Sequence, residues 1–72
     1  MTDQKGKVYR MTQLVGTSNT GFDDGVRNAI ARAQKTLRHI DWFEIKEQRG
    51  KLTDNGIEYQ VIMEVGFLLE EP

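Results

Sequence analysis

The sequence predicts an α+β domain with the element order strand, helix, strand, strand. Apolar and polar residues alternate in three segments, at 7–15, after Asp41 and at 57–69, which is typical of strands buried on one face. Between the first two of these segments the apolar period changes to three or four residues, which indicates a helix. The run Thr53-Asp54-Asn55-Gly56 separates the last two strands and is a strong turn signal.

The length of the chain limits how it can be stabilised. It has 72 residues, no Cys, and His39 as its single His. A chain this short forms one domain, here 1–72, and buries only about 60% of its unfolded surface when it folds. Disulfides and a His/Cys metal centre cannot supplement that core, so we expect no metal site. Oligomerisation and a bound ligand remain as sources of stability.

Charge and hydropathy restrict the partners. Lys and Arg number 10 against 11 Asp and Glu, for a net charge of -1. The broad positive field that attracts nucleic acid is therefore missing, and we expect no nucleic-acid partner. No apolar run approaches the roughly 20 residues of a membrane span, and residues 1–10 lack the apolar stretch of a signal peptide. We expect a cytoplasmic protein with no membrane partner.

The first strand is expected over 7–15, after a frayed tail at 1–6. The segment 16–21 holds two Gly, two Thr, one Ser and one Asn, residue types that favour turns. A loop is therefore predicted between the first strand and the helix.

The helix is expected to begin at Phe22. Its apolar positions fall on one helical face: Phe22, Val26, Ala29, Ile30, Ala33, Leu37 and Ile40. Asp23 and Asp24 lie in the first turn, and basic side chains lie toward the end: Arg32, Lys35, Arg38 and His39. Both ends thus complement the helix dipole, and we interpret the basic stripe and His39 as electrostatic rather than ligand-binding.

The pairing of the last two strands follows from their apolar faces. A two-residue Asn55-Gly56 turn would mix polar and apolar positions on each face. A three-residue loop or a bulge instead sets Phe43 near Phe67 and Ile45 near Val65, and makes one face apolar beneath the helix. The opposite face, which a single helix cannot cover, then carries Trp42, Glu44, Lys46, Gln48, Gln60, Ile62 and Leu68. In this register Gln60 lies near Gly50, eight residues along the strand from Trp42.

The residues offer little for catalysis and more for binding. Nothing assembles a nucleophile, a base and an orienting group, so we predict no catalytic residues and no enzyme. Trp42 is a flat apolar platform that can stack on a planar ring, and Gln60 can present a donor beside an acceptor. The pattern alone favours the plainer interpretation, in which Trp42 fills a protein interface and Gln60 is a surface strand residue.

The run GTSNTGFDDGVRNAIARAQKTLRHIDWFEIKEQRG followed by EYQVIMEVGF resembles the dodecins, small flavin-binding proteins of bacteria and archaea. The likeness spans Lys7 to about Glu70, and the motifs Val15–Ser18, Trp42–Glu44 and Tyr59–Val61 stand in the family's order. The resemblance implies one helix packed on a three-stranded antiparallel sheet, with twelve copies closing into a hollow shell.

The resemblance also implies site roles. Trp42 would stack on the isoalloxazine ring, Gln60 would hydrogen-bond its pyrimidine edge, and Arg49 would contact the ligand. Flavins would be held in stacked pairs across a twofold axis, with FMN favoured, riboflavin or another flavin possible, and coenzyme A as a further ligand of some members. We therefore expect a non-catalytic flavin store. The alternatives are a structural oligomer without a working flavin site and a flavoenzyme.

Three positions depart from the family pattern. Gly21 stands where the helix usually begins with Ser, and Gly25 stands where Ala is usual in the first turns. An interior Gly costs a helix about 1 kcal/mol relative to Ala, so these changes bear on helix stability rather than on the site. Leu68 stands where some coenzyme A-binding relatives have Arg, which argues against that ligand.

Overall fold

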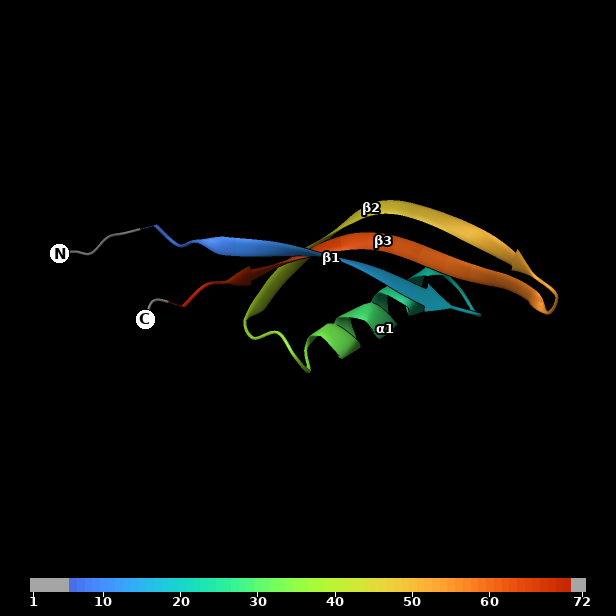
Figure 1. Ribbon diagram of the computed structural model, residues 1–72, viewed down its shortest axis with the longest axis horizontal. Coiled ribbons are helices and arrows are strands. Elements are labelled where there is room, and N and C mark those ends of the chain that lie inside the picture. Colours follow the sequence, from blue (N-terminus) through green and yellow to red (C-terminus); the bar gives the residue numbers. More distant parts are fainter. Residues whose placement is uncertain (1–5, 71–72) are drawn as a thin grey trace.

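The fold class is confirmed by the computed structural model, which describes residues 6–70. The elements are β1 (Tyr9–Ser18), α1 (Phe22–Ala33), β2 (Ile40–Thr53) and β3 (Gly56–Leu68), and the strands form one antiparallel sheet in the order β1-β3-β2 (Figure 1). The expected tail at 1–6 lies, except for Gly6, outside the described residues.

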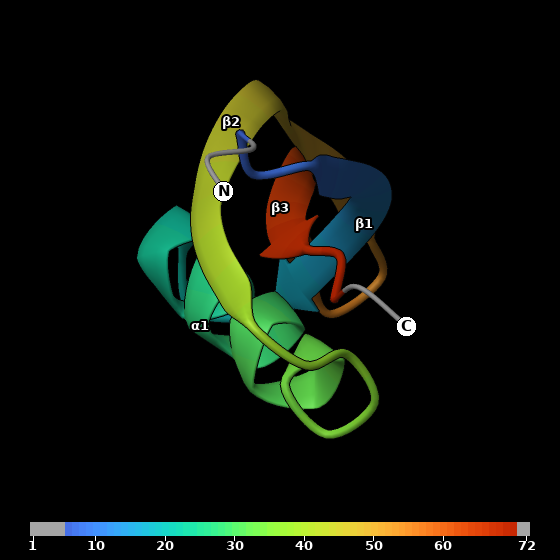
Figure 2. The same cartoon turned by 90° about the vertical axis from the view of Figure 1, so that its left-hand side faces the viewer.

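The core lies between α1 and the central strand. Val61, Met63 and Val65 of β3 are completely buried, and Ala29 of the helix packs against them. Figure 2 shows α1 on one side of the sheet only. Within residues 6–70 no other element covers the opposite face, as the single helix predicts.

Close contact between α1 and β1 depends on Gly16. A Cβ at Gly16 would lie 2.2 Å from the backbone oxygen of Gly25 and 2.9 Å from the Cβ of Ala29. A Cβ at Gly25 would meet its nearest neighbours at 3.4 and 3.5 Å, which is ordinary contact. The packing of α1 against β1 therefore requires Gly at position 16, whereas position 25 has room for a Cβ.

The boundary between the first strand and the loop was predicted wrongly. β1 continues to Ser18, because Gly16 pairs with Val61 and Thr17 pairs with Gln60. The loop is limited to 19–21, where Ser18 Oγ accepts the backbone N–H of Thr20 at 2.9 Å. The pairing with β3 outweighs the turn preference of these small polar residues.

The helix ends at Ala33, seven residues before the apolar pattern stops. A tight turn follows, in which the N–H of Leu37 bonds the carbonyl of Ala33 at 2.8 Å. Leu37 and Ile40 nevertheless pack against the core, which explains why the apolar spacing continues past the helix.

The basic stripe is consequently not a helical feature throughout. Arg32 alone lies in the last turn of α1. Arg38 and His39 follow the helix, and His39, at φ 64°, places its Nε2 atom 2.6 Å from Glu70 Oε2. The expectation that Arg38 and His39 complement the helix dipole was wrong, although the reading of His39 as electrostatic agrees with this contact.

The β2–β3 hairpin has a tighter turn than predicted. Thr53 pairs with Gly56 around Asp54 and Asn55, and Thr53 Oγ1 donates to the Gly56 carbonyl at 3.0 Å. Gly56 has φ 133°, a conformation that favours glycine.

The β2–β3 register differs from the prediction by two residues before Lys46 and by one residue after it. Phe43 lies opposite Val65 and Ile45 opposite Met63. Because side chains alternate with a period of two, Phe43 and Ile45 still face the helix side, as predicted. A bulge at Lys46 then reverses the alternation, so Gln48 pairs with Val61 and lies on the helix side, contrary to expectation.

Candidate functional site

Trp42 lies on the uncovered face of the sheet. It stands opposite Gly66 of β3 and is 40% exposed. A Cβ at Gly66 would meet three atoms of the indole at 2.4 to 2.8 Å. The indole thus rests directly on the backbone of the central strand, and the missing side chain of Gly66 makes room for it.

Tyr9 contacts the same indole from β1. The two ring centroids are 4.7 Å apart with an interplanar angle of 57°. The Tyr9 hydroxyl donates to Asp41 Oδ2 at 3.0 Å, and this hydrogen bond raises the pKa of Tyr9 above its usual value. Trp42 of β2 is therefore bounded by residues of the other two strands. The repeating alternation gave no signal for the hydrogen bond between Tyr9 and Asp41, because Asp41 is the extra residue of a bulge.

Arg49 and Gln60, the other two predicted site residues, lie directly opposite each other on β2 and β3. Arg49 Nε donates to Gln60 Oε1 at 2.7 Å, and Gln60 Nε2 donates to Glu58 Oε1 at 3.0 Å. The bulge at Lys46 brings Arg49 to this face, which strict alternation would not do. The bond uses the Nε atom of Arg49, so its two terminal nitrogens can serve a ligand.

Trp42 does not lie with this pair. Gln60 is six residues before Gly66, the partner of Trp42, along β3. At about 3.3 Å per residue the two positions are roughly 20 Å apart. The sequence placed Gln60 opposite Gly50 and farther away, so the register correction shortens the separation without bringing the two side chains together.

Charged side chains occupy the sheet between Trp42 and Gln60. Glu44 and Glu64 are paired across the strands, and Lys46 Nζ lies 3.7 Å from a carboxylate oxygen of each. Directly opposed like charges destabilise a sheet, and the ammonium group offsets that repulsion. The ammonium group of Lys46 thus bridges the two carboxylates.

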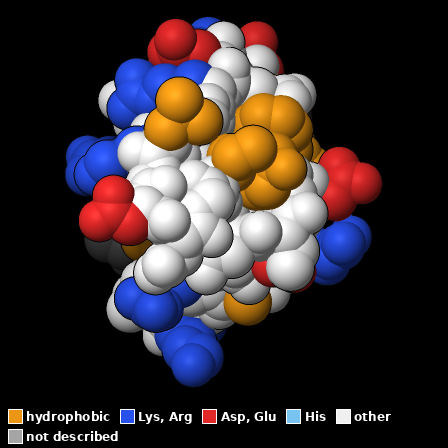
Figure 3. Space-filling model, turned by 90° about the vertical axis from the view of Figure 1, so that its right-hand side faces the viewer, with side chains coloured by type: hydrophobic (Ala, Val, Ile, Leu, Met, Phe, Trp, Pro, Cys, Tyr) orange, Lys and Arg blue, Asp and Glu red, His pale blue; other side chains and the backbone are white. Residues whose placement is uncertain are grey.

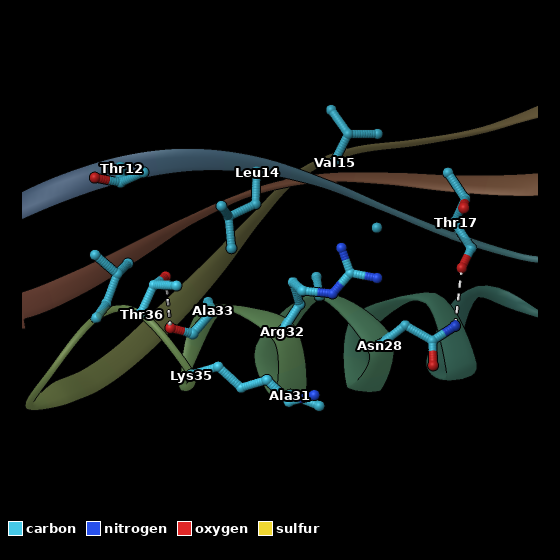
Figure 4. Close-up of a pocket in the computed structure, with 13 residues that line it drawn as sticks. Thr12, Leu14, Val15, Thr17, Asn28, Ala31, Arg32, Ala33, Lys35 and Thr36 are labelled. Carbon is cyan, nitrogen blue, oxygen red and sulfur yellow. Dashed lines mark hydrogen bonds between the residues drawn. The ribbon is translucent and has the colours of Figure 1, made fainter.

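Two grooves flank α1, and neither contains Trp42 or Gln60. The first has a volume of about 670 Å³ and lies between α1 and β1, where Thr12, Arg32 and Thr36 line it (Figure 4). The second, of about 550 Å³, lies between α1 and β2 and is lined largely by apolar side chains, including Val26, Ile30 and Phe43.

Residues 6–70 contain no group of three or more His, Cys, Asp or Glu placed to hold a metal ion. In the same range no helix is long and apolar enough to cross a membrane.

Comparison with known proteins identifies the family. The Dodecin family model matches residues 8–70. A dodecin from Thermus thermophilus is 58% identical over 67 residues, covering 92% of this chain and 97% of the relative. The structure of dodecin from Streptomyces coelicolor is 46% identical and covers 96% of this chain and all of its own, with a TM-score of 0.88.

A more distant structure is a calcium dodecin from Mycobacterium tuberculosis, described as calcium chelating with a novel calcium-binding site. It is 28% identical, covers 90% of this chain and 97% of its own, and superposes with a TM-score of 0.79. The family match over nearly the whole chain, the 58% identity and the shared fold agree, and the chain belongs to the dodecin family.

Proposed function

We propose that this protein binds and stores flavin, FMN or riboflavin, without turning it over. The observation that carries the proposal is the indole of Trp42, which lies on Gly66 and remains 40% exposed on a sheet face that no element of residues 6–70 covers. An exposed planar aromatic side chain of this kind can stack on an isoalloxazine ring.

The site is assembled from more than one subunit. Trp42 and Gln60 of one chain are roughly 20 Å apart at the rise of a β-strand, whereas an isoalloxazine, with three fused six-membered rings, is only about 10 Å long. A ring stacked on Trp42 therefore takes its Gln60 contact from another chain. Gln60 offers its carboxamide to the pyrimidine edge, and Arg49 offers its terminal nitrogens to a ring carbonyl or to the phosphate of FMN.

The surface of the subunit supports assembly into a shell of twelve copies. Phe43 of β2 lines the groove between α1 and β2 and is 48% exposed. At the hairpin, Leu52 is 83% exposed and Ile57 is 44% exposed. Hydrophobic side chains form patches at this end of the molecule (Figure 3). Apolar surface of this kind is typical of contacts between subunits.

Flavin titration of Trp42→Ala tests the proposal. The wild-type assembly is expected to quench flavin emission on binding, and the variant to lose most of its affinity while keeping its size in light scattering. Gln60→Ala is expected to lose less, because each hydrogen bond contributes about 0.5 to 1.5 kcal/mol. The mass of the ligand released on heating identifies the flavin and shows whether coenzyme A is also carried.

The alternatives give different results. A structural oligomer without a flavin site would assemble normally and bind no flavin, with or without Trp42. A flavoenzyme would turn over a reductant steadily. Tight binding of flavin by a dissociated single chain would contradict the proposed assembly of the site.

A further inference from the structure

We propose that Tyr9 is a positioning residue for flavin binding, which holds the indole of Trp42 in its stacking orientation before the ligand arrives. The inference rests on the proposed function, but the restraint on the indole exists in the flavin-free protein and can be measured there. It assigns a role to a side chain that lies outside the Trp42, Gln60 and Arg49 set.

The contact between Tyr9 and Trp42 spans the central strand. Tyr9 belongs to β1 and Trp42 to β2, and the sheet order places β3 between them. Strands lie about 4.8 Å apart, so the two backbones are separated by roughly 10 Å. Gly66, opposite Trp42, contributes no side chain, so the Tyr9 ring, whose own partner on β3 is Leu68, can reach the indole across the central strand at a centroid distance of 4.7 Å.

Tyr9 is also held by a hydrogen bond to Asp41, which lies in a β-bulge. The β2–β3 register shifts between Ile40 and Trp42, which makes Asp41 the extra residue. Bulges redirect side chains, and here the Asp41 carboxylate accepts the Tyr9 hydroxyl at 3.0 Å. Tyr9 is thus fixed at its tip by Asp41 and along its ring by the neighbouring indole.

The consequence for Trp42 is a restricted rotamer. Gly66 forms the floor beneath the indole, Tyr9 blocks it from one side, and Trp42 is 40% exposed to solvent. Without Tyr9, an exposed side chain on an edge strand could leave the sheet by rotation about its side-chain bonds. Ordering such a side chain on binding costs affinity, so its restriction in advance is worth about two- to tenfold in the dissociation constant.

The experiment uses the fact that Trp42 is the single Trp of the chain. Time-resolved fluorescence anisotropy of the flavin-free assembly reports the motion of this indole alone. We expect slow decay in the wild type and a fast component in Tyr9→Leu, accompanied by a two- to tenfold loss of riboflavin affinity. Tyr9→Phe, which keeps the ring and loses the hydroxyl, is expected to fall between the two.

Two further variants separate positioning from a general loss of structure. Asp41→Asn retains an oxygen that can accept the hydroxyl and is expected to preserve most of the restriction, whereas Asp41→Ala is not. Tyr59→Phe makes the same chemical change in the other Tyr, which contacts Phe22 edge-on at 5.0 Å, and is the matched control.

The outcomes distinguish the inference from the proposed function. Unchanged anisotropy in Tyr9→Leu would overturn the inference whether or not flavin binds. A mobile indole with unchanged riboflavin affinity would overturn the link between restraint and binding. A wild-type protein that binds no flavin but shows the Tyr9-dependent anisotropy would instead refute the proposed function and leave the restraint established.

Discussion

Gly66→Ala tests whether flavin binding requires the indole to lie on the sheet. The new Cβ would stand 2.4 Å from Trp42 Cζ2, so the indole must move about 1 Å to reach an ordinary contact of 3.4 Å. Gly66 is not among the positive-φ glycines, so Ala can adopt its backbone conformation. The strain falls on the end of one side chain and not on the fold.

We expect Gly66→Ala to lower riboflavin affinity with little effect on stability. Stacking of an aromatic pair is worth about 0.5 to 1.5 kcal/mol beyond burial, so a displaced indole weakens riboflavin binding by up to about tenfold. Replacement of a strand Gly by Ala gains about 0.5 to 1 kcal/mol, so the stability of the assembly changes little. Fluorescence titration with riboflavin and thermal unfolding measure the two quantities separately.

Gly50→Ala is the matched control for this substitution. Its Cβ would meet Ile57 Cγ2 at 3.5 Å, an ordinary contact, and it stands on the neighbouring strand β2 away from Trp42. Wild-type riboflavin affinity in Gly66→Ala would refute the requirement for a flat indole. An equal loss of affinity in both variants would assign the effect to the sheet in general.

Three other substitutions test the fold. Gly25→Ala is expected to raise the thermal midpoint and the free energy of unfolding by up to about 1 kcal/mol, because Ala favours a helix more than Gly does and its Cβ would meet its nearest neighbour at an ordinary 3.4 Å. A lower midpoint would contradict this packing. Gly16→Ala is expected to cost about 1 to 3 kcal/mol in the same measurement, because its Cβ would overlap Gly25. Asp24 accepts a hydrogen bond from Ser18 Oγ, which lowers the pKa of Asp24 below its usual value of 3.8. The charged carboxylate therefore stabilises the folded protein above pH 3.8, and this contribution is lost as the pH falls through the folded-state pKa. Thermal midpoints of Asp24→Asn should therefore fall less on acidification than those of the wild type, and parallel curves would count against a role for Asp24.

The fold was largely predictable because its signals are periodic. Alternation with a period of two identified the faces of β3 and of β2 up to Lys46, and Val61, Met63 and Val65 form the buried face as expected. The ends of the helix and of the strands were harder to predict. Leu37 and Ile40 continue the helical spacing but reach the core from a turn and from the start of a strand. An apolar side chain can be buried from any backbone conformation that points it at the core, so its spacing alone does not show where a helix ends.

The site was predictable only in part. Trp42 on an uncovered face follows from the alternation and from the presence of a single helix. The pairing of Arg49 with Gln60 does not follow from it, since strict alternation directs Arg49 to the helix side. A bulge depends on local backbone preferences and on the fit of both strands to their neighbours, and no residue type in β2 marks its position.

The two bulges in β2 together explain how one strand of 14 residues contributes to both ends of the proposed flavin site. The first, at Asp41, turns a carboxylate toward Tyr9 and leaves Trp42 over Gly66. The second, at Lys46, reverses the alternation so that Arg49 emerges on the same face as Trp42. An unbroken strand would direct Arg49 toward the helix and give the uncovered face a platform without its cation. Because Trp42 and Gln60 of one chain lie roughly 20 Å apart on that face, the proposed flavin site takes these two residues from different chains.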